Sequence, residues 1–273
     1  MGISRREFLR TTAGAAAAHS GIAAMRPLSI DDALEAPENS LGTSSEGEIF
    51  AGYVRKTSKL IEMVSNSRPA TENARLYREI FDLYESAAQY AKSKSDSVAW
   101  ENPQKLTYLS WQIVARMWQA RLVIGQAGIN IMKEGEEIRI KGLKPIKSSG
   151  RRDSTVYGYL RAIQNYEEVK DIYRQMEEHG KVFPSEQIGL GLGSRGNIAP
   201  LSLVLDNMDS TFENAINSHV PAEHENALLK KWADAIEHNY KKTGETYHLE
   251  KLRFPARDKL EPYLAGRGFL VRK

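Results

Sequence analysis

Hydrophobic side chains recur every three or four residues along most of the chain beyond residue 44, the spacing of a helix with one buried face. Segments rich in Gly, Pro, Ser and Asn interrupt this pattern. The pattern predicts six long helices, at residues 45–64, 71–95, 103–133, 154–180, 200–217 and 221–242. The expected fold is therefore mainly α, a multi-helix bundle.

The helix expected at 103–133 is apolar on two faces, and Asn102 followed by Pro103 is typical of a helix start. A helix that is apolar on two sides packs between other helices, so this one should be the central member of the bundle.

A little β structure is expected as well. Residues 137–147 alternate between apolar and polar around Gly142 and Pro145, which predicts a short hairpin. In the C-terminal segment the pattern favours a strand at 247–254, a short helix at 256–264 and a final strand at 268–271.

The N-terminus has the layout of an export signal, with a basic start followed by a weakly apolar, Ala-rich stretch up to residue 25. Residues 4–10 read Ser-Arg-Arg-Glu-Phe-Leu-Arg and resemble the core motif of twin-arginine (Tat) signal peptides, with Arg in place of Lys at the last position. The matching residues are Ser4, Arg5, Arg6, Phe8, Leu9 and Arg10. The alternative is a surface helix that begins at Ser4 and is followed by a flexible linker.

The resemblance implies that the protein folds in the cytoplasm and crosses the membrane through a transient complex with the Tat translocase. Its destination would be periplasmic, extracellular or peripheral to the membrane or envelope. We expect a signal peptide at 1–25, a linker at 26–44 and a single helical domain at 45–273. Charged and polar residues interrupt even the most apolar run, at 109–132, so no transmembrane span is expected in the mature chain.

The chain of 273 residues is 41% hydrophobic and contains no cysteine. Disulfides, iron–sulfur clusters held by Cys, attached c-type haem and Cys-ligated metals are thereby excluded. Other cofactors remain open, and so does the oligomeric state.

Residues 189–197 are unusually rich in glycine. Gly191, Gly193 and Gly196 match G-x-G-x-x-G, and a loop with Gly191, Gly193, Ser194 and Arg195 could hold an anionic ligand. A dinucleotide-binding motif needs a strand before it and a helix directly after it, and neither is expected here. The alternative is a plain loop between helices.

Carboxylates and histidines give weaker signals. Asp234 and His238, four residues apart on one helix, could form half of a metal site. Asp206, Asp209 and Glu213 form an acidic stripe that is expected to face water.

The formal charge of +3 is unevenly distributed. Residues 138–152 carry six basic and no acidic side chains, and residues 251–273 carry seven basic and two acidic ones. If these two segments pair, they form a basic flank that could meet an anionic surface or ligand, although basic residues at a sheet edge also prevent aggregation. The flank residues of the first segment are Arg139, Lys141, Lys144, Lys147, Arg151 and Arg152.

Together these features favour an exported helical binding or interaction protein, which could associate with an anionic envelope or membrane surface through the basic flank. The alternative is a Cys-free exported enzyme or cofactor-binding protein with a site between helices near 189–197. Nucleic acid is a disfavoured partner, because the export signal argues against it and no nucleic-acid-binding motif is present.

The export signal can be tested by replacing Arg5 and Arg6 with Lys. We expect nearly complete loss of export, measured by cell fractionation, because lysine cannot reproduce the planar donor forks of two guanidinium groups. An ordinary Sec signal would tolerate the exchange, so unchanged export would contradict the Tat assignment.

Overall fold

The fold was obtained as a computed structural model, which describes residues 45–64, 68–125, 131–148, 154–184, 198–243, 247 and 249–265. Within these residues the fold is mainly α with one small antiparallel hairpin, as the sequence predicts. The elements are α3 (Ser45–Met63), α4 (Ala70–Asp96), α5 (Gln104–Gly125), β1 (Glu137–Ile138), β2 (Ile146–Lys147), α6 (Ser154–Glu178), α7 (Leu201–Asn217), α8 (Ala222–Thr243), the 3-10 helix η3 (Leu249–Lys251) and α9 (Ala256–Leu264). The predicted signal motif at 4–10 and the glycine-rich segment at 189–197 lie outside the described residues.

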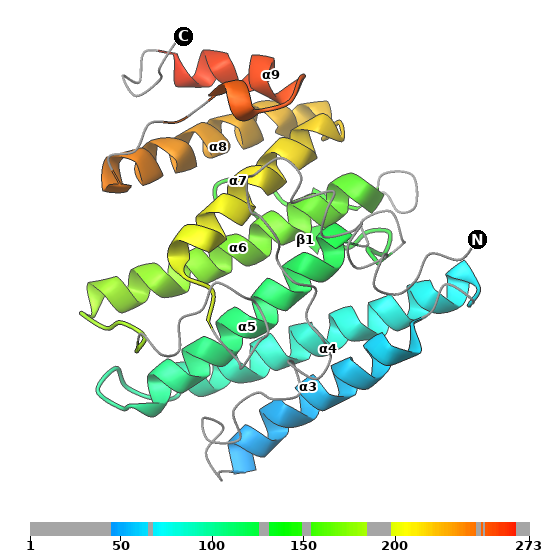
Figure 1. Cartoon of the computed structure of the whole chain (residues 1–273), viewed down its shortest axis with the longest axis vertical. Helices are drawn as coiled ribbons and strands as arrows, with labels where there is room; N and C mark the ends of the chain where they lie inside the picture. The colour runs from blue at the N-terminus through cyan, green and yellow to red at the C-terminus, as the bar shows by residue number, and fades with distance from the viewer. Residues whose placement is uncertain are drawn as a thin grey trace.

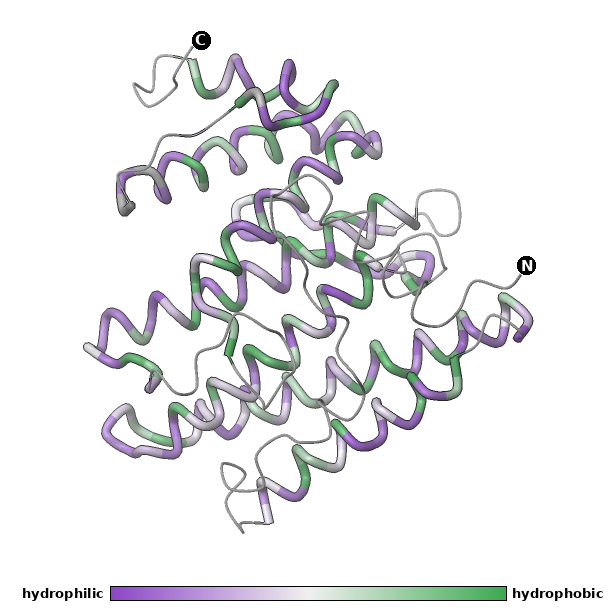
Figure 2. Tube along the Cα trace, in the orientation of Figure 1, coloured by the Kyte–Doolittle hydropathy of each residue, from purple (hydrophilic) through white to green (hydrophobic). Residues whose placement is uncertain are grey.

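The helices pack mainly against their neighbours in sequence. Helix α4 contacts α3 and α5, helix α6 contacts α5 and α7, and α8 lies against α7 and α9. Figure 1 shows the result, with α3 at one end of the long axis and α9 at the other. The hydrophobic residues in Figure 2 gather on the faces that the helices turn toward one another.

Helix α5 is the central helix that its two apolar faces predict. Its first turn is capped by Asn102, whose Oδ1 accepts a hydrogen bond from the Gln104 amide at 2.9 Å. Residues 131–133, which the sequence places in the same helix, are not helical. Their backbone has side-chain partners instead. The Ile131 carbonyl accepts from Arg78 of α4 at 2.9 Å, and the Lys133 amide donates to the nearby Glu136 at 3.0 Å.

The predicted hairpin is confirmed, with Glu137 opposite Lys147 and Ile138 opposite Ile146. Helix α6 holds it in place, because Gln164 Oε1 accepts from the Arg139 amide at 3.1 Å and Glu167 Oε2 accepts from the Lys141 amide at 2.9 Å. The isoleucines of the hairpin are fully buried, so it completes one side of the core. These residues are Ile138, Ile140 and Ile146.

The strand expected at 247–254 is wrong, since Leu249–Lys251 forms the 3-10 helix η3, whereas the short helix at 256–264 is confirmed as α9. Side chains of α7 bind one backbone amide in this segment and one at the start of α9. The Arg253 amide donates to Glu213 at 2.8 Å, and the Ala256 amide donates to Asn217 at 3.0 Å. The strand expected at 268–271 lies outside the described residues.

A buried ion cluster joins α4, α5 and α6, and its members are Glu85, Arg116, Arg161 and Glu168. Arg116, only 3% exposed, contacts Glu85 at 2.5 Å and Glu168 at 2.5 Å. Arg161 contacts the same Glu85 carboxylate at 2.7 Å. Because each helix contributes at least one charge, the cluster sets how the three helices align.

The cluster also sets a pH dependence. Burial alone would raise the pKa of Glu85, but hydrogen bonds and charges from Arg116, with Gln89 and Arg161, outweigh burial and lower the pKa to about 2. Glu85 therefore stabilises the folded state above the ordinary carboxyl pKa, and this contribution is lost as the pH falls toward about 2.

Replacing the buried Arg116 with Ala leaves the half-buried carboxylates of Glu85 and Glu168 without their main partner. We expect the free energy of unfolding, measured by urea denaturation, to fall by about 3–5 kcal/mol. The matched control is Lys92→Ala, which removes the exposed Lys92–Asp96 pair and should cost less than about 1 kcal/mol. Equal effects of the two substitutions would show that the cluster does not hold the helices together.

Candidate functional site

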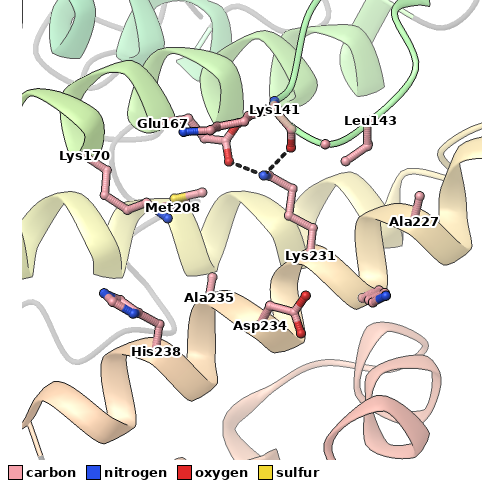
Figure 3. Close-up of a pocket in the computed structure, with 12 residues that line it drawn as sticks. Lys141, Leu143, Glu167, Lys170, Met208, Ala227, Lys231, Asp234, Ala235 and His238 are labelled. Atoms are coloured by element: carbon pink, nitrogen blue, oxygen red, sulfur yellow. Dashed lines mark hydrogen bonds and ion pairs between the residues drawn. The ribbon is translucent and has the colours of Figure 1, made fainter. Parts of the chain in front are cut away.

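A pocket of about 370 Å³ opens where the hairpin meets helices α6, α7 and α8 (Figure 3). This volume is within the range of small-molecule sites. The lining contains four lysines, two carboxylates and one histidine, and the other members are glycine or apolar. The lining residues are Lys141, Gly142, Leu143, Glu167, Lys170, Met208, Ala227, Lys230, Lys231, Asp234, Ala235 and His238.

The hairpin turn, α6 and α8 each place their lining residues through their local backbone structure. Gly142 has a φ of 82°, which the hairpin turn requires and which residues with a side chain rarely adopt. Helix α6 presents Glu167 and Lys170, three residues apart and hence on one face. Helix α8 presents several lining residues at helical spacing, and its small residues Ala227 and Ala235 leave room between the longer side chains.

The Lys231 side chain is held in place at the edge of the pocket by two contacts. Its ammonium group contacts Glu167 at 2.5 Å and donates to the Lys141 carbonyl oxygen at 2.5 Å. Glu167 is itself buried and also accepts from the Lys141 amide, so one carboxylate ties α6 to both the hairpin and α8. In Figure 3 these contacts are the dashed lines at the centre of the view.

Lys170 is in a different situation. Its side chain is half-buried, and in the described part of the chain its ammonium group has neither a hydrogen bond nor an ion pair. Burial lowers the pKa of Lys170, and the charges of Lys231 and Lys141 act in the same direction, against the attraction of Glu167 and Asp171. Figure 3 shows its side chain extending from α6 toward Met208 of α7.

The lining therefore carries an excess of positive charge. Four lysines face two carboxylates, and Glu167 is already paired with Lys231. Lys230 is exposed and has no ion pair among the described residues. A pocket with this composition attracts anions, and its partly desolvated lysines would bind them more strongly than fully hydrated ones.

The two weak metal candidates, Asp234 and His238, both lie in the pocket lining. Across the described ranges no group of three or more His, Asp or Glu side chains is arranged to hold a metal ion. The predicted half-site thus gains no further ligand within that part of the chain.

The structure describes the hairpin part of the predicted basic flank. Arg139 is exposed and pairs with Glu137 at 2.6 Å, and Lys141 contacts Asp171 at 3.4 Å. Lys144 and Lys147 are exposed and have no ion pair within the described ranges. The two remaining flank residues, Arg151 and Arg152, lie outside them, and within them β1 is the only strand paired with β2.

The acidic stripe on α7 does not face water as predicted. Only Asp206 is exposed, whereas Glu213 is 8% exposed and pairs with Arg253 at 3.0 Å. Asp209 accepts hydrogen bonds from the Trp232 indole and from the Tyr247 hydroxyl, the latter at 3.2 Å. The helical wheel placed these carboxylates opposite the apolar face, but Trp232 of α8 and the residues Tyr247 and Arg253 on either side of η3 contact them.

The pocket itself was missed by the sequence reasoning. The one local signal is the pair Lys230–Lys231 beside Asp234 and His238 on a helix face. The sequence around Lys170 does not indicate a functional role, because whether this lysine has a partner depends on which residues surround it in space.

No protein-family model, curated protein or solved structure matches this chain. Among the described residues, no helix is both long enough and apolar enough to span a membrane.

The burial of Asp209 on α7 can be tested through its effect on stability at different pH values. Burial raises its pKa to about 6, against the hydrogen bonds from Trp232 and Tyr247. Since an acid with a raised pKa stabilises the folded state only while protonated, stability is lost as the pH rises from about 4 to about 6.

We expect Asp209→Asn, which keeps an oxygen acceptor, to remove this loss. The variant should be more stable than the parent at neutral pH by up to about 3 kcal/mol and close to it at acidic pH, measured by urea denaturation. Asp258→Asn, at an exposed site, is the control. A variant that is destabilised equally at both pH values would contradict the assigned pKa.

Proposed function

We propose that the protein is an exported helical binding protein whose ligand is a small anion held in the lysine-lined pocket. The observation that carries this proposal is Lys170, a half-buried ammonium group with no hydrogen bond or ion pair in the described part of the chain. Burial partly desolvates this charge, and Glu167 and Asp171 attract it without forming an ion pair with it, so a bound anion would supply the closer partner.

The neighbouring contacts favour a ligand over a merely structural role. Lys231 shows how this fold satisfies a structural lysine, with a buried carboxylate and a carbonyl oxygen both at 2.5 Å. Lys170 lies one helical turn from the same Glu167, yet the carboxylate is directed to Lys231. An anion bound between Lys170 and the α8 lysines would complete the charge balance of the pocket.

The N-terminal motif supports a location outside the cytoplasm for this binding. The hairpin also carries the exposed Lys144 and Lys147 of the predicted basic flank. An enzyme remains the alternative, because the pocket also contains His238 and Asp234, which can move protons.

Calorimetric titration with inorganic phosphate, sulfate and a short dicarboxylate tests the proposal. We expect saturable binding of at least one anion, weakened by salt, and an affinity at least about tenfold lower for Lys170→Met, since the variant loses the cation that faces the ligand. Lys144→Met, on the hairpin and outside the pocket lining, is the matched control.

Absence of binding for all three anions would overturn the proposal. An equal loss of affinity in Lys170→Met and Lys144→Met would also overturn it, because it would indicate diffuse surface attraction and not a defined site.

A further inference from the structure

We propose that Lys170 forms an imine with a small ligand that carries both an anionic group and an aldehyde or ketone. This inference rests on the proposed anion-binding function and adds the class of ligand. A small oxo acid and a phosphorylated aldehyde share the required chemistry.

Among the pocket lysines, Lys170 is the one that is half-buried and has no hydrogen bond or ion pair within the described residues. Lys231 is held by Glu167 and by the Lys141 carbonyl oxygen. Lys141 is directed to Asp171 at 3.4 Å, and Lys230 is exposed to water. A nucleophilic lysine must lose its proton, and burial beside other cations favours that loss.

The lining provides the remaining parts of the reaction. Lys230, the α8 lysine without an ion pair among the described residues, would hold the anionic group. The Lys170 side chain, which extends from α6 toward Met208 of α7 (Figure 3), would then meet the carbonyl carbon. His238 and Asp234 are the lining side chains able to exchange a proton with the reacting oxygen. The volume of about 370 Å³ suits a small molecule.

The step conserves atoms and electrons. The neutral Lys170 amine attacks the carbonyl carbon and the carbon–oxygen π bond breaks. The oxygen takes one proton and the nitrogen gives up one of its two, which gives a neutral carbinolamine. That hydroxyl then leaves as water after receiving a second proton, while the nitrogen lone pair forms the carbon–nitrogen double bond and the nitrogen loses its remaining proton. No oxidant or reductant is needed.

The experiment uses glyoxylate as the probe and cyanoborohydride to trap any imine on the full chain, followed by peptide mapping. We expect one major adduct, on Lys170, formed faster than on any exposed lysine near neutral pH, since the lowered pKa of Lys170 gives it a larger share of neutral amine. Inorganic phosphate should slow this adduct selectively. Lys170→Arg, which keeps the charge but removes the nucleophile, should lack it.

Lys144→Arg is the matched control and should label at Lys170 like the parent. The selectivity should shrink as the pH approaches the ordinary lysine pKa, because the exposed amines then become neutral too. Labelling spread evenly over exposed lysines, in a protein that still binds phosphate or sulfate by calorimetry, would overturn the imine and leave the proposed function standing. Failure of all anion binding would overturn both.

Discussion

The buried ion cluster on α4, α5 and α6 is the constraint on which the rest of the structure depends. Arg116 lies between two carboxylates that belong to different helices, and Arg161 reaches the same Glu85. A buried charge that loses its partner is strongly destabilising, so sliding or rotating any of these helices is costly. Apolar contacts alone tolerate such shifts much better.

Helix α6 contributes residues both to the ion cluster and to the pocket, so the cluster also fixes the position of the pocket wall. The turns that bear Arg161 and Glu168 in the cluster also bear Gln164 and Glu167, which accept hydrogen bonds from the hairpin amides. The hairpin turn then meets α8 through Lys231. The pocket is therefore built on a chain of charged contacts that begins in the core, and its walls are positioned before any ligand arrives.

Periodicity predicted the helices well, because the apolar stripe of each helix is a local property of the chain. It failed at residues 131–133, where the Ile131 carbonyl bonds to Arg78 of α4, and in the segment 247–254, where the Arg253 amide bonds to Glu213 of α7. It also failed for Asp209 and Glu213, because a helical wheel shows which residues share a face but not which neighbour covers that face. Residues such as Trp232 and Arg253 decided that burial.

The sequence by itself determined the mainly α class, the order of the helices, the hairpin and the absence of every cysteine-based centre. It also carries the N-terminal motif on which the expectation of export rests. Only the tertiary structure decided which lysine is paired and which is not. Glu167 lies three residues from Lys170 along α6 yet pairs with Lys231 of α8, because partner choice depends on distance in space and on burial. Because Glu167 pairs with Lys231, Lys170 lines the pocket without an ion pair among the described residues. This unpaired lysine is what makes the pocket a candidate site.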